Sequence, residues 1–280
     1  MNEAMPAEGI YIYAIIAAPA PLNSMAECKA PHAGGPMEQK VDCPPQFNFG
    51  PVGIGGRGDV CRTIQHEGLA AVVSSTAQKK YKVSRENLLA HEIVIEAVMR
   101  SHTVLPVRFC TIADNEAKVK LILAREYGRF QELLQKMEGK RELGVKALFK
   151  EEIVFKLILD KYGEIRALKE KIATLPAEKS HFQRAEIGRM VEVALQAEKE
   201  ARKAEILAAL TPLALEVKTN ALYGDMMMLN AAFLVEQARE PEFDRKIQEL
   251  AEQDGAAVKY KYVGTVPPFN FVNLTIAMED

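Results

Sequence analysis

Two long helical patterns separated by Leu175-Pro176 constrain the fold of this 280-residue chain more than any other feature. Apolar residues recur every seven positions in both patterns: Ile158, Ile165 and Ile172 in the first, and Ile187, Ala194, Ala201 and Ala208, accompanied by Met190, Ala197 and Ala204, in the second. A heptad repeat lines one side of a helix with apolar side chains, and a proline interrupts a helix. The pattern therefore predicts an antiparallel helical hairpin, a coiled coil over residues 151–210, whose alanines let the two helices approach closely.

The segments on either side of this hairpin predict a mixed domain around it. Strands are expected over residues 142–149, 213–220, 226–235 and in the terminal segment 259–276, with a helix from Pro241 to about Asp254. The order β-α-β-β-α-β is the ferredoxin-like arrangement, here with its first helix enlarged into the hairpin. We expect the terminal segment "KYKYVGTVPPFNFVNLTI" to supply the last strand of this domain.

The stretch "LYGDMMMLNAAFLVE" (222–236) carries apolar residues on both faces of its predicted strand. A strand of that kind is typical of the middle of a sheet that is covered on both sides. Asn230 lies within it, so we expect a buried amide that needs several hydrogen-bond partners. The adjacent methionines favour core packing over an adaptable binding surface.

The first half of the chain indicates a looser version of the same plan. The predicted elements are a strand over 10–17, a hairpin of strands 60–66 and 69–75 turning at Glu67-Gly68, a helix capped by Ser84, a strand over 104–109, and a helix over 115–137 stopped by Gly139. A Pro- and Gly-rich loop over 18–59 is either functional or mobile. We thus predict an α+β protein of two ferredoxin-like α/β sandwich domains, over 1–140 and 141–280.

Composition and charge narrow the possible partners. The chain is 48% hydrophobic and 26% charged, and its 36 Lys+Arg nearly balance its 38 Asp+Glu. This balance is typical of a soluble globular protein. It produces no overall positive electrostatic potential that would attract nucleic acid or an anionic membrane. The apolar N-terminal stretch follows Glu3 and Glu8 without any Lys or Arg, unlike a secretory signal. We therefore expect a cytoplasmic protein.

The 18–59 loop holds the most obvious candidates for a ligand site. Gly53, Gly55 and Gly58 match G-x-G-x-x-G, but that motif binds a nucleotide only between a strand and a helix, and here a strand pattern follows it. Cys28, His32 and Cys43 share the same loop, yet zinc sites usually contain a closely spaced pair of ligands, which these residues lack. We predict a flexible loop, no metal and no cofactor.

Catalytic residues are equally hard to assign. Glu92 in a predicted helix and Arg108 on a predicted strand suit either a catalytic pair or an internal ion pair, and we favour the ion pair. His66, His102 and His181 have no partner visible in the sequence, and no nucleophile motif is present. These patterns favour a protein that is not an enzyme.

Several blocks of this sequence resemble the gas vesicle protein F/L family (GvpF/GvpL). They are "YIYAII", "GLAAVVS", "SRENLLAHEIVIEAVM", "TVLPVRFCTIA", "GKRELGVKALF", "LYGDMMMLNAAFLVE" and "KYVGTVPPFNFVNL", in the family's order, from about residue 10 to 277. The most specific pair is "TVLPVRF" with "PPFNFVNL". The chain departs from the family pattern in its long 18–59 loop and in Cys110, where a glycine is expected.

This resemblance implies an accessory or minor structural protein of gas vesicles, with a ferredoxin-like C-terminal domain and a helical insertion. It also implies contact with the small, hydrophobic major shell protein, with other gas vesicle accessory proteins as further candidates, and no catalytic activity. Our first hypothesis is therefore a binding module that holds the shell protein during assembly. The alternative is a small-molecule or metal-binding enzyme or sensor that uses the 18–59 loop.

Overall fold

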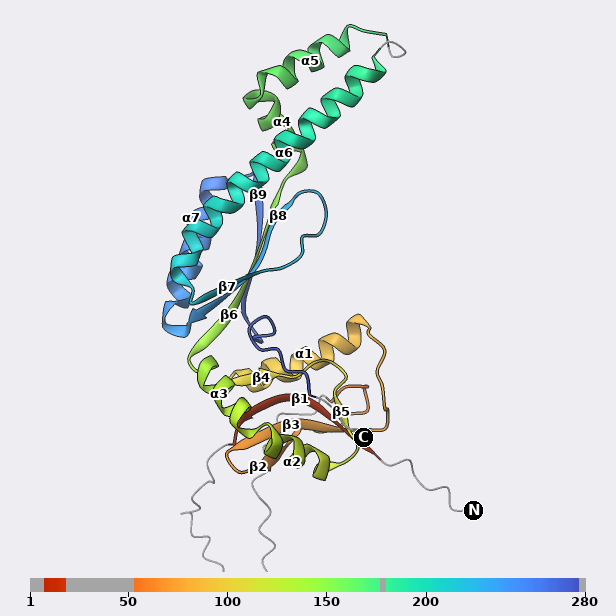
Figure 1. Ribbon diagram of the computed structural model, residues 1–280, viewed down its shortest axis with the longest axis vertical. Helices are drawn as coiled ribbons and strands as arrows, with labels where there is room; N and C mark the ends of the chain where they lie inside the picture. Colours follow the sequence, from red (N-terminus) through yellow and green to blue (C-terminus); the bar gives the residue numbers. More distant parts are fainter. Residues whose placement is uncertain (1–7, 19–52, 177–179, 277–280) are drawn as a thin grey trace, which may run out of the picture. The chain divides into compact units, whose positions relative to one another are not determined.

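The computed structural model describes residues 8–18, 53–176 and 180–276 and divides into two compact units (Figure 1). The first unit comprises Met1–Glu138 together with Pro267–Asp280, and the second comprises Gly139–Val266. Each unit contains one antiparallel sheet with helices, which confirms the mixed α+β class. Within the described ranges, no helix combines the length and the hydropathy that a membrane span requires.

The sheet of the first unit forms around a strand that is buried from Ile10 to Ile16. Its strands are β1 (Gly9–Ala17), β2 (Arg62–His66), β3 (Leu69–Thr76), β4 (Val104–Pro106) and β5 (Ile112–Ala113), in the order β2-β3-β1-β4 with β5 also paired to β1. His66 pairs with Leu69 across the turn, and Glu67 adopts a φ of 49°. The predicted two-residue hairpin is therefore confirmed, because such turns require a positive φ. By contrast, β4 ends three residues earlier than predicted.

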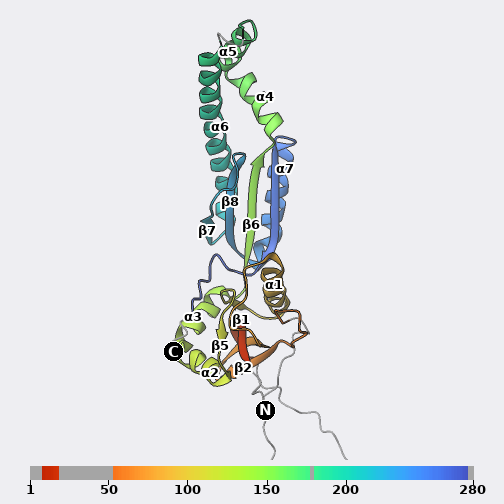
Figure 2. The same ribbon diagram turned by 90° about the vertical axis from the view of Figure 1, so that its right-hand side faces the viewer.

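Three helices cover this sheet on its two faces. They are α1 (Arg85–Met99), α2 (Glu116–Arg125) and α3 (Tyr127–Met137). The Ser84 hydroxyl accepts a hydrogen bond from the Asn87 N–H at 3.2 Å, so the predicted N-cap of α1 is confirmed. Figure 2 shows α1 on one side of β1 and α3 on the other. The single helix predicted over 115–137 is wrong, because the backbone leaves the helical region at Glu126 (φ −98°, ψ 12°).

The sheet of the second unit repeats the strand order of the first. Its strands are β6 (Lys140–Phe149), β7 (Glu216–Thr219), β8 (Met227–Glu236) and β9 (Val258–Val266), in the order β7-β8-β6-β9 with every neighbouring pair antiparallel. The residues of β8 are all buried except Glu236 at its end. The predicted central strand is confirmed, since a strand with two apolar faces is stable only where both are covered.

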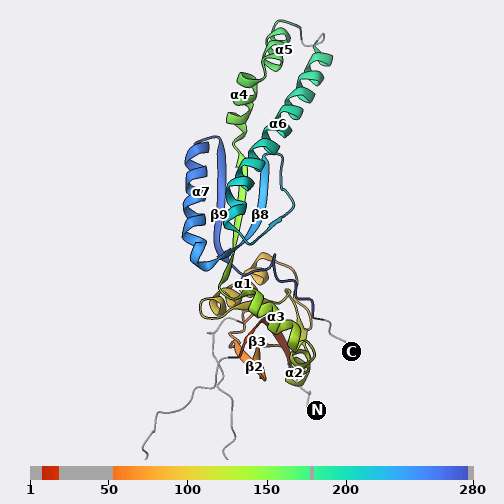
Figure 3. The same cartoon turned by 60° about the vertical axis from the view of Figure 1, so that its left-hand side comes forward.

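The helices of the second unit are α4 (Glu151–Lys161), α5 (Gly163–Ala173), α6 (His181–Leu210) and α7 (Glu240–Asp254). Figure 3 shows α7 and the C-terminal half of α6 on the same face of the β8-β6-β9 sheet. Ile206 and Leu210 of α6 and Phe243 of α7 share one core with the inward side chains of β6 and β8. Short 3-10 turns, Thr211–Leu213 and Gln237–Arg239, follow α6 and β8.

The N-terminal half of α6 packs against α4 and α5 instead of the sheet (Figure 2). Ile158 and Ile165 are buried there, as the heptad pattern predicts. Of the predicted alanine positions, Ala194 is buried in this cluster, but the prediction is wrong for Ala197, Ala201, Ala204 and Ala208, which are exposed. The reason is that α6 extends beyond α4 and α5. Its C-terminal half packs Ile206 and Leu210 against the sheet, and the exposed alanines lie on the opposite face of the helix.

The end of the chain also differs from the prediction. β9 ends at Val266, and the following residues belong to the first unit rather than completing the second sheet. Phe271, Val272 and Leu274 are buried there, and Leu274 forms an isolated parallel bridge with Val107. The physical cause is Pro267-Pro268, which lack the N–H groups needed to continue the β9 ladder. The expectation that residues 267–276 supply the last strand of the second domain is therefore corrected.

Candidate functional site

A buried cluster of hydrogen-bonded polar side chains lies in the first unit. We call Tyr11, Tyr13, Ser74, Tyr81 and His91 the tyrosine–histidine cluster. Tyr11 and Tyr13 project from β1 to the same side, because residues two positions apart in a strand share one face of the sheet. His91 projects from α1 onto them, with ring centroids 5.7 Å from Tyr11 and 5.6 Å from Tyr13. Each member of the cluster is at most 4% exposed.

The hydrogen bonds of His91 define its tautomer. Its Nε2 lies 3.1 Å from the Val107 carbonyl oxygen, which can only accept, so Nε2 carries the proton. Its Nδ1, 3.1 Å from the Tyr11 hydroxyl, accepts the Tyr11 proton. Tyr11 in turn accepts a hydrogen bond from the Cys110 N–H at 2.9 Å. Burial lowers the pKa of His91 to about 4, against the opposing influence of its bond to Val107. His91 is thus a neutral link between α1 and the chain after β4.

Tyr13 extends the same network to the glycine-rich turn. Its hydroxyl accepts a hydrogen bond from the Ile54 N–H at 2.7 Å and lies 2.9 Å from the Ser74 Oγ. Burial raises the pKa of both Tyr11 and Tyr13, although their hydrogen bonds oppose this. Ile54 is completely buried, and the Gly53 N–H closes the turn onto the Asp59 carbonyl at 2.9 Å. This turn leads to β2 and not to a helix, so it lacks the helix N-terminus that a dinucleotide motif requires.

This network has the features of a structural core. The hydroxyls of Tyr11 and Tyr13 and both ring nitrogens of His91 already have partners inside the protein. A general acid or base must instead reach a substrate proton. The cluster therefore fixes β1 against α1 and the glycine turn, and it leaves no reactive atom facing solvent.

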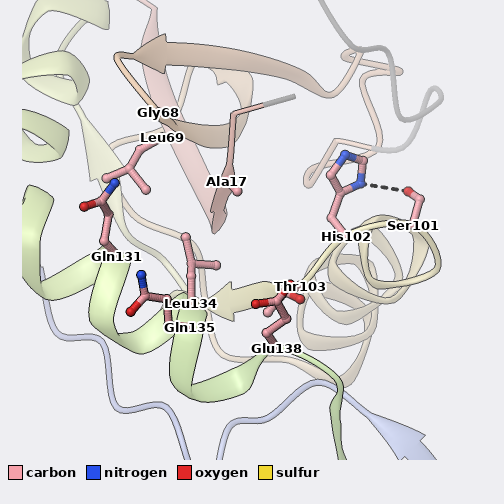
Figure 4. Close-up of a pocket in the computed structure, with 10 residues that line it drawn as sticks. All are labelled: Ala17, Gly68, Leu69, Ser101, His102, Thr103, Gln131, Leu134, Gln135 and Glu138. Atoms are coloured by element: carbon pink, nitrogen blue, oxygen red, sulfur yellow. Dashed lines mark hydrogen bonds between the residues drawn. The ribbon is translucent and has the colours of Figure 1, made fainter. Parts of the chain in front are cut away.

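A pocket of about 380 Å³ with a mixed polar and apolar lining opens elsewhere in the first unit (Figure 4). It is lined by residues from the β2–β3 turn, the segment before β4 and α3, namely Ala17, Gly68, Leu69, Ser101, His102, Thr103, Gln131, Leu134, Gln135 and Glu138. Ser101 Oγ and His102 Nδ1 lie 2.8 Å apart. Figure 4 shows the Glu138 carboxylate beside Thr103 and directed away from the His102 ring. A nucleophile needs a base that a third group orients, and Glu138 does not take that position.

The structure does not bring together the two charged residues proposed from the sequence. Glu92 is half-buried on α1, where burial and then the neighbouring Glu96 raise its pKa. Arg108 is exposed, and its carbonyl accepts a hydrogen bond from Thr111 in a turn. Neither side chain forms an ion pair with any described residue. The strand alternation on which the prediction for Arg108 depends stops at Pro106, where β4 ends.

The remaining candidates occupy separate places. Asn230 is 6% exposed in β8, and its amide donates to the Ala221 carbonyl at 2.7 Å. His66 ends β2, and His181 is exposed at the start of α6. Cys28, His32 and Cys43 lie outside the described residues. Within the described ranges, no three His, Cys, Asp or Glu side chains gather as a metal site would require.

Sequence reasoning missed the tyrosine–histidine cluster. The signal was the pair of tyrosines two positions apart in "YIYAII", which places two hydroxyls on one face of a buried strand and so requires polar partners. The partners come from residues 54, 74, 91 and 110, and no local pattern links them. The connection becomes visible only when the strands are paired.

Comparison with known proteins identifies the family. The family model for gas vesicle synthesis protein GvpL/GvpF matches residues 9–273. Gas vesicle protein F of Dolichospermum flosaquae is 27% identical over 205 residues, covering 72% of this chain and 82% of that protein. Gas vesicle protein F of Streptomyces sp. (strain CB03234) is 29% identical over 220 residues, covering 79% of this chain and 91% of that protein.

Solved structures show the same fold. The crystal structure of the gas vesicle protein GvpF from Anabaena sp. PCC7120 superposes with a TM-score of 0.72 at 24% identity, covering 96% of this chain and 99% of that one. The GvpF structure from Microcystis aeruginosa gives a TM-score of 0.68 at 23% identity, covering 95% and 99%. Together with the family match over nearly the whole chain, we conclude that this protein belongs to the gas vesicle synthesis protein GvpL/GvpF family.

Proposed function

We propose that this protein is a gas vesicle accessory or minor structural protein that binds the major shell protein and supports vesicle assembly. The observation that carries the proposal is the family match over residues 9–273. The relatives at 27–29% identity bear the name gas vesicle protein F. We place the protein in the cytoplasm and at the gas vesicle, with other gas vesicle accessory proteins as further candidate partners.

The proposal assigns no catalysis, cofactor, nucleic acid, membrane or small-molecule substrate to the chain. The state of the reactive side chains supports this. Tyr11, Tyr13 and His91 are buried, and their polar atoms form hydrogen bonds with other side chains and with the backbone. The chain also carries a net charge of only −2, which favours neither nucleic acid nor an anionic surface. These features are consistent with a protein that works through its surfaces.

We further infer that both sheets follow the ferredoxin-like plan and that the helical arm is a short coiled coil. The strand orders β2-β3-β1-β4 and β7-β8-β6-β9 match one another position by position. In the second unit α4–α6 and α7 occupy the two helix positions of a β-α-β-β-α-β unit. Ile158 and Ile165, one heptad apart, support helix pairing in the arm.

Co-expression with the major shell protein tests the proposal. We expect an affinity-tagged form of the full chain to retain the shell protein in a complex that survives gel filtration. Metal analysis and thermal-shift measurements with nucleotides serve as controls for the alternative function. We expect no bound metal and no change in melting temperature. Failure to retain the shell protein, together with a defined metal stoichiometry, would overturn the proposal in favour of the metal-binding alternative.

A further inference from the structure

The segment between β3 and α1 presents a row of cations from a rigid base. Lys79, Lys80 and Lys82 are exposed, and Arg85 begins α1. Tyr81, between them, points inward: its ring is 4% exposed, its hydroxyl lies 2.8 Å from the Thr76 Oγ1, and its N–H donates to the Cys110 Sγ at 3.1 Å. Because this anchor fixes the backbone, less conformational freedom is lost when the cations bind a partner.

The cations of this segment are not used inside the described chain. None of them forms an ion pair with a described residue, whereas nearby Arg57 is paired with Glu8 at 2.8 Å and with Asp59 at 3.4 Å. The Asn87 amide donates to the Lys82 carbonyl at 2.9 Å, which links the segment to the first turn of α1. The result is a local positive charge on a protein whose net charge is −2.

Exposed apolar side chains follow these cations in the sequence, from Val83 into α1. Val83 is 71% exposed, Leu89 50%, Leu88 42% and Ile93 41%. Leu89 and Ile93 are four residues apart, so they lie on the same side of the helix. Exposed aliphatic side chains that adjoin one another mark interaction surfaces more often than isolated ones do.

We propose that this basic–apolar surface, formed by Lys79, Lys80, Lys82, Val83, Arg85, Leu88, Leu89 and Ile93, binds an acidic amphipathic segment of a protein partner. This inference rests on the proposed function and names the chemistry of the partner segment. Its carboxylates lie over the cations at the N-terminal end of α1, and its apolar side chains lie over the aliphatic part.

The acidic neighbours of the surface define both the orientation and the class of partner. Glu86 lies in the first turn of α1, and Glu92 and Glu96 follow further along the helix. Four cations lie at the N-terminal end of α1, against Arg100 at its C-cap, so this asymmetry aligns the bound segment in one direction. The two later glutamates repel a continuous anionic surface such as a lipid bilayer or a nucleic-acid backbone, which favours a protein segment.

The test compares two triple charge reversals in the full chain. K79E/K80E/K82E changes the proposed surface, and K120E/K259E/K261E changes three other exposed lysines with the same effect on net charge. We expect the first variant to bind the co-expressed shell protein at least tenfold more weakly and the second to remain within twofold of the unchanged chain. Raising NaCl should weaken the unchanged chain more than K79E/K80E/K82E, because salt screens the charge pairs.

The outcomes separate this inference from the proposed function. If the unchanged chain binds the shell protein and both triple variants bind equally well, the surface assignment is overturned while the proposed function stands. If the unchanged chain does not bind it, the proposed function fails first. As a direct probe, a synthetic helix with leucine on one face and glutamate on the other should compete, and its lysine counterpart should not. Lysine-dependent binding to phosphatidylserine vesicles without such competition would assign the surface to a membrane and overturn the inference.

Discussion

At the scale of single residues, Cys110 adopts a backbone conformation that is unusual for a residue other than glycine. Its φ of 66° lies in the left-handed region, where residues other than glycine are strained by about 1–2 kcal/mol. Its Sγ nevertheless accepts the Tyr81 N–H at 3.1 Å, which compensates part of that strain. The sequence comparison marks this position as one where glycine is expected, and the backbone angle provides the physical reason.

Substitutions at Cys110 should therefore separate strain from hydrogen bonding. Cys110→Ala keeps the strain and leaves the Tyr81 N–H without its acceptor, so we expect a loss of about 1 kcal/mol in the free energy of unfolding. Cys110→Gly loses the same acceptor but relaxes the backbone, so it should be more stable than Cys110→Ala by about 1 kcal/mol. Urea unfolding followed by tyrosine fluorescence measures both; an alanine variant as stable as the glycine variant would contradict this account.

His91 gives the first unit a defined response to acid. The folded pKa of about 4 lies below the ordinary value of 6.5, so the unfolded chain binds the proton more readily. The contribution of neutral His91 to the free energy of unfolding is therefore fully present above pH 6.5. It is lost as the pH drops from 6.5 toward 4, and the loss amounts to about 3 kcal/mol. Protonated Nδ1 would oppose the Tyr11 hydroxyl, which already accepts from the Cys110 N–H.

The His91→Gln variant isolates this effect, because its amide keeps a donor and an acceptor but does not titrate in this range. We expect the unfolding free energy of the unchanged chain to fall more steeply than that of the variant between pH 6.5 and 4. Hydrogen exchange of peptides from β1 and α1 locates the loss within the first unit. Parallel pH profiles of the two proteins would show that His91 is not the responsible group.

At the scale of elements, an ion pair between α6 and α7 holds the second unit together. Arg202 binds Asp254 through two nitrogens, at 3.0 and 2.7 Å, and also contacts Glu205. Burial opposes the charge of Arg202, but the bonds to Asp254 and Glu205 raise its pKa. The Tyr260 hydroxyl of β9 donates to the same Asp254 carboxylate at 2.6 Å. Three elements thus meet at one partly buried carboxylate.

Asp254→Asn should lower the unfolding free energy of the second unit by about 2 kcal/mol, since it leaves a partly buried guanidinium without its charge partner. The matched control is Lys161→Met, which removes the exposed Lys161–Glu198 pair at 2.6 Å in the helical arm. Exposed pairs contribute little, so the control should leave the unfolding midpoint unchanged. Thermal unfolding by circular dichroism distinguishes the two, and equal effects would contradict the assignment.

Most of the individual elements are predictable from local sequence, and their errors have local causes. The hairpin at Glu67-Gly68, the Ser84 cap and the buried β8 strand follow from turn chemistry, capping and hydrophobic pattern. The break at Glu126 has no proline or glycine signal at that residue. The alanine row of α6 keeps the heptad spacing, but the helix exchanges partners along its length, and spacing alone does not say which face is buried.

At the scale of the whole molecule, the first unit is built from two segments of the chain that are separated in sequence by the second unit. The terminal segment returns to the first unit, where Phe271, Val272 and Leu274 are buried and the Asn273 carbonyl accepts a hydrogen bond from Arg129 at 3.4 Å. Alternating apolar residues at the end of a chain suggest a last strand of the preceding sheet, so sequence reasoning placed it there. The tyrosine–histidine cluster was unpredictable for the same reason, because only the tertiary structure brings its members together.

The final segment should therefore stabilise the first unit and not the second. A chain that ends at Val266 loses the burial of Phe271, Val272 and Leu274, and each such side chain contributes about 2 kcal/mol when fully buried. It also loses Phe269, whose ring lies 6.4 Å from that of His91. We expect faster hydrogen exchange in β1, α1 and β4, with β6 and β8 unchanged.

A chain that ends at Ile276 provides the matched control, because it keeps every contact described for this segment. Leu274→Ala gives a milder test: it should lower the unfolding free energy by about 3 kcal/mol by leaving a cavity beside Val107. Faster exchange confined to peptides of the first unit, in both altered chains but not in the control, would support the assignment of residues 267–276 to that unit. Faster exchange in β6 or β8 would instead show that the segment completes the second sheet.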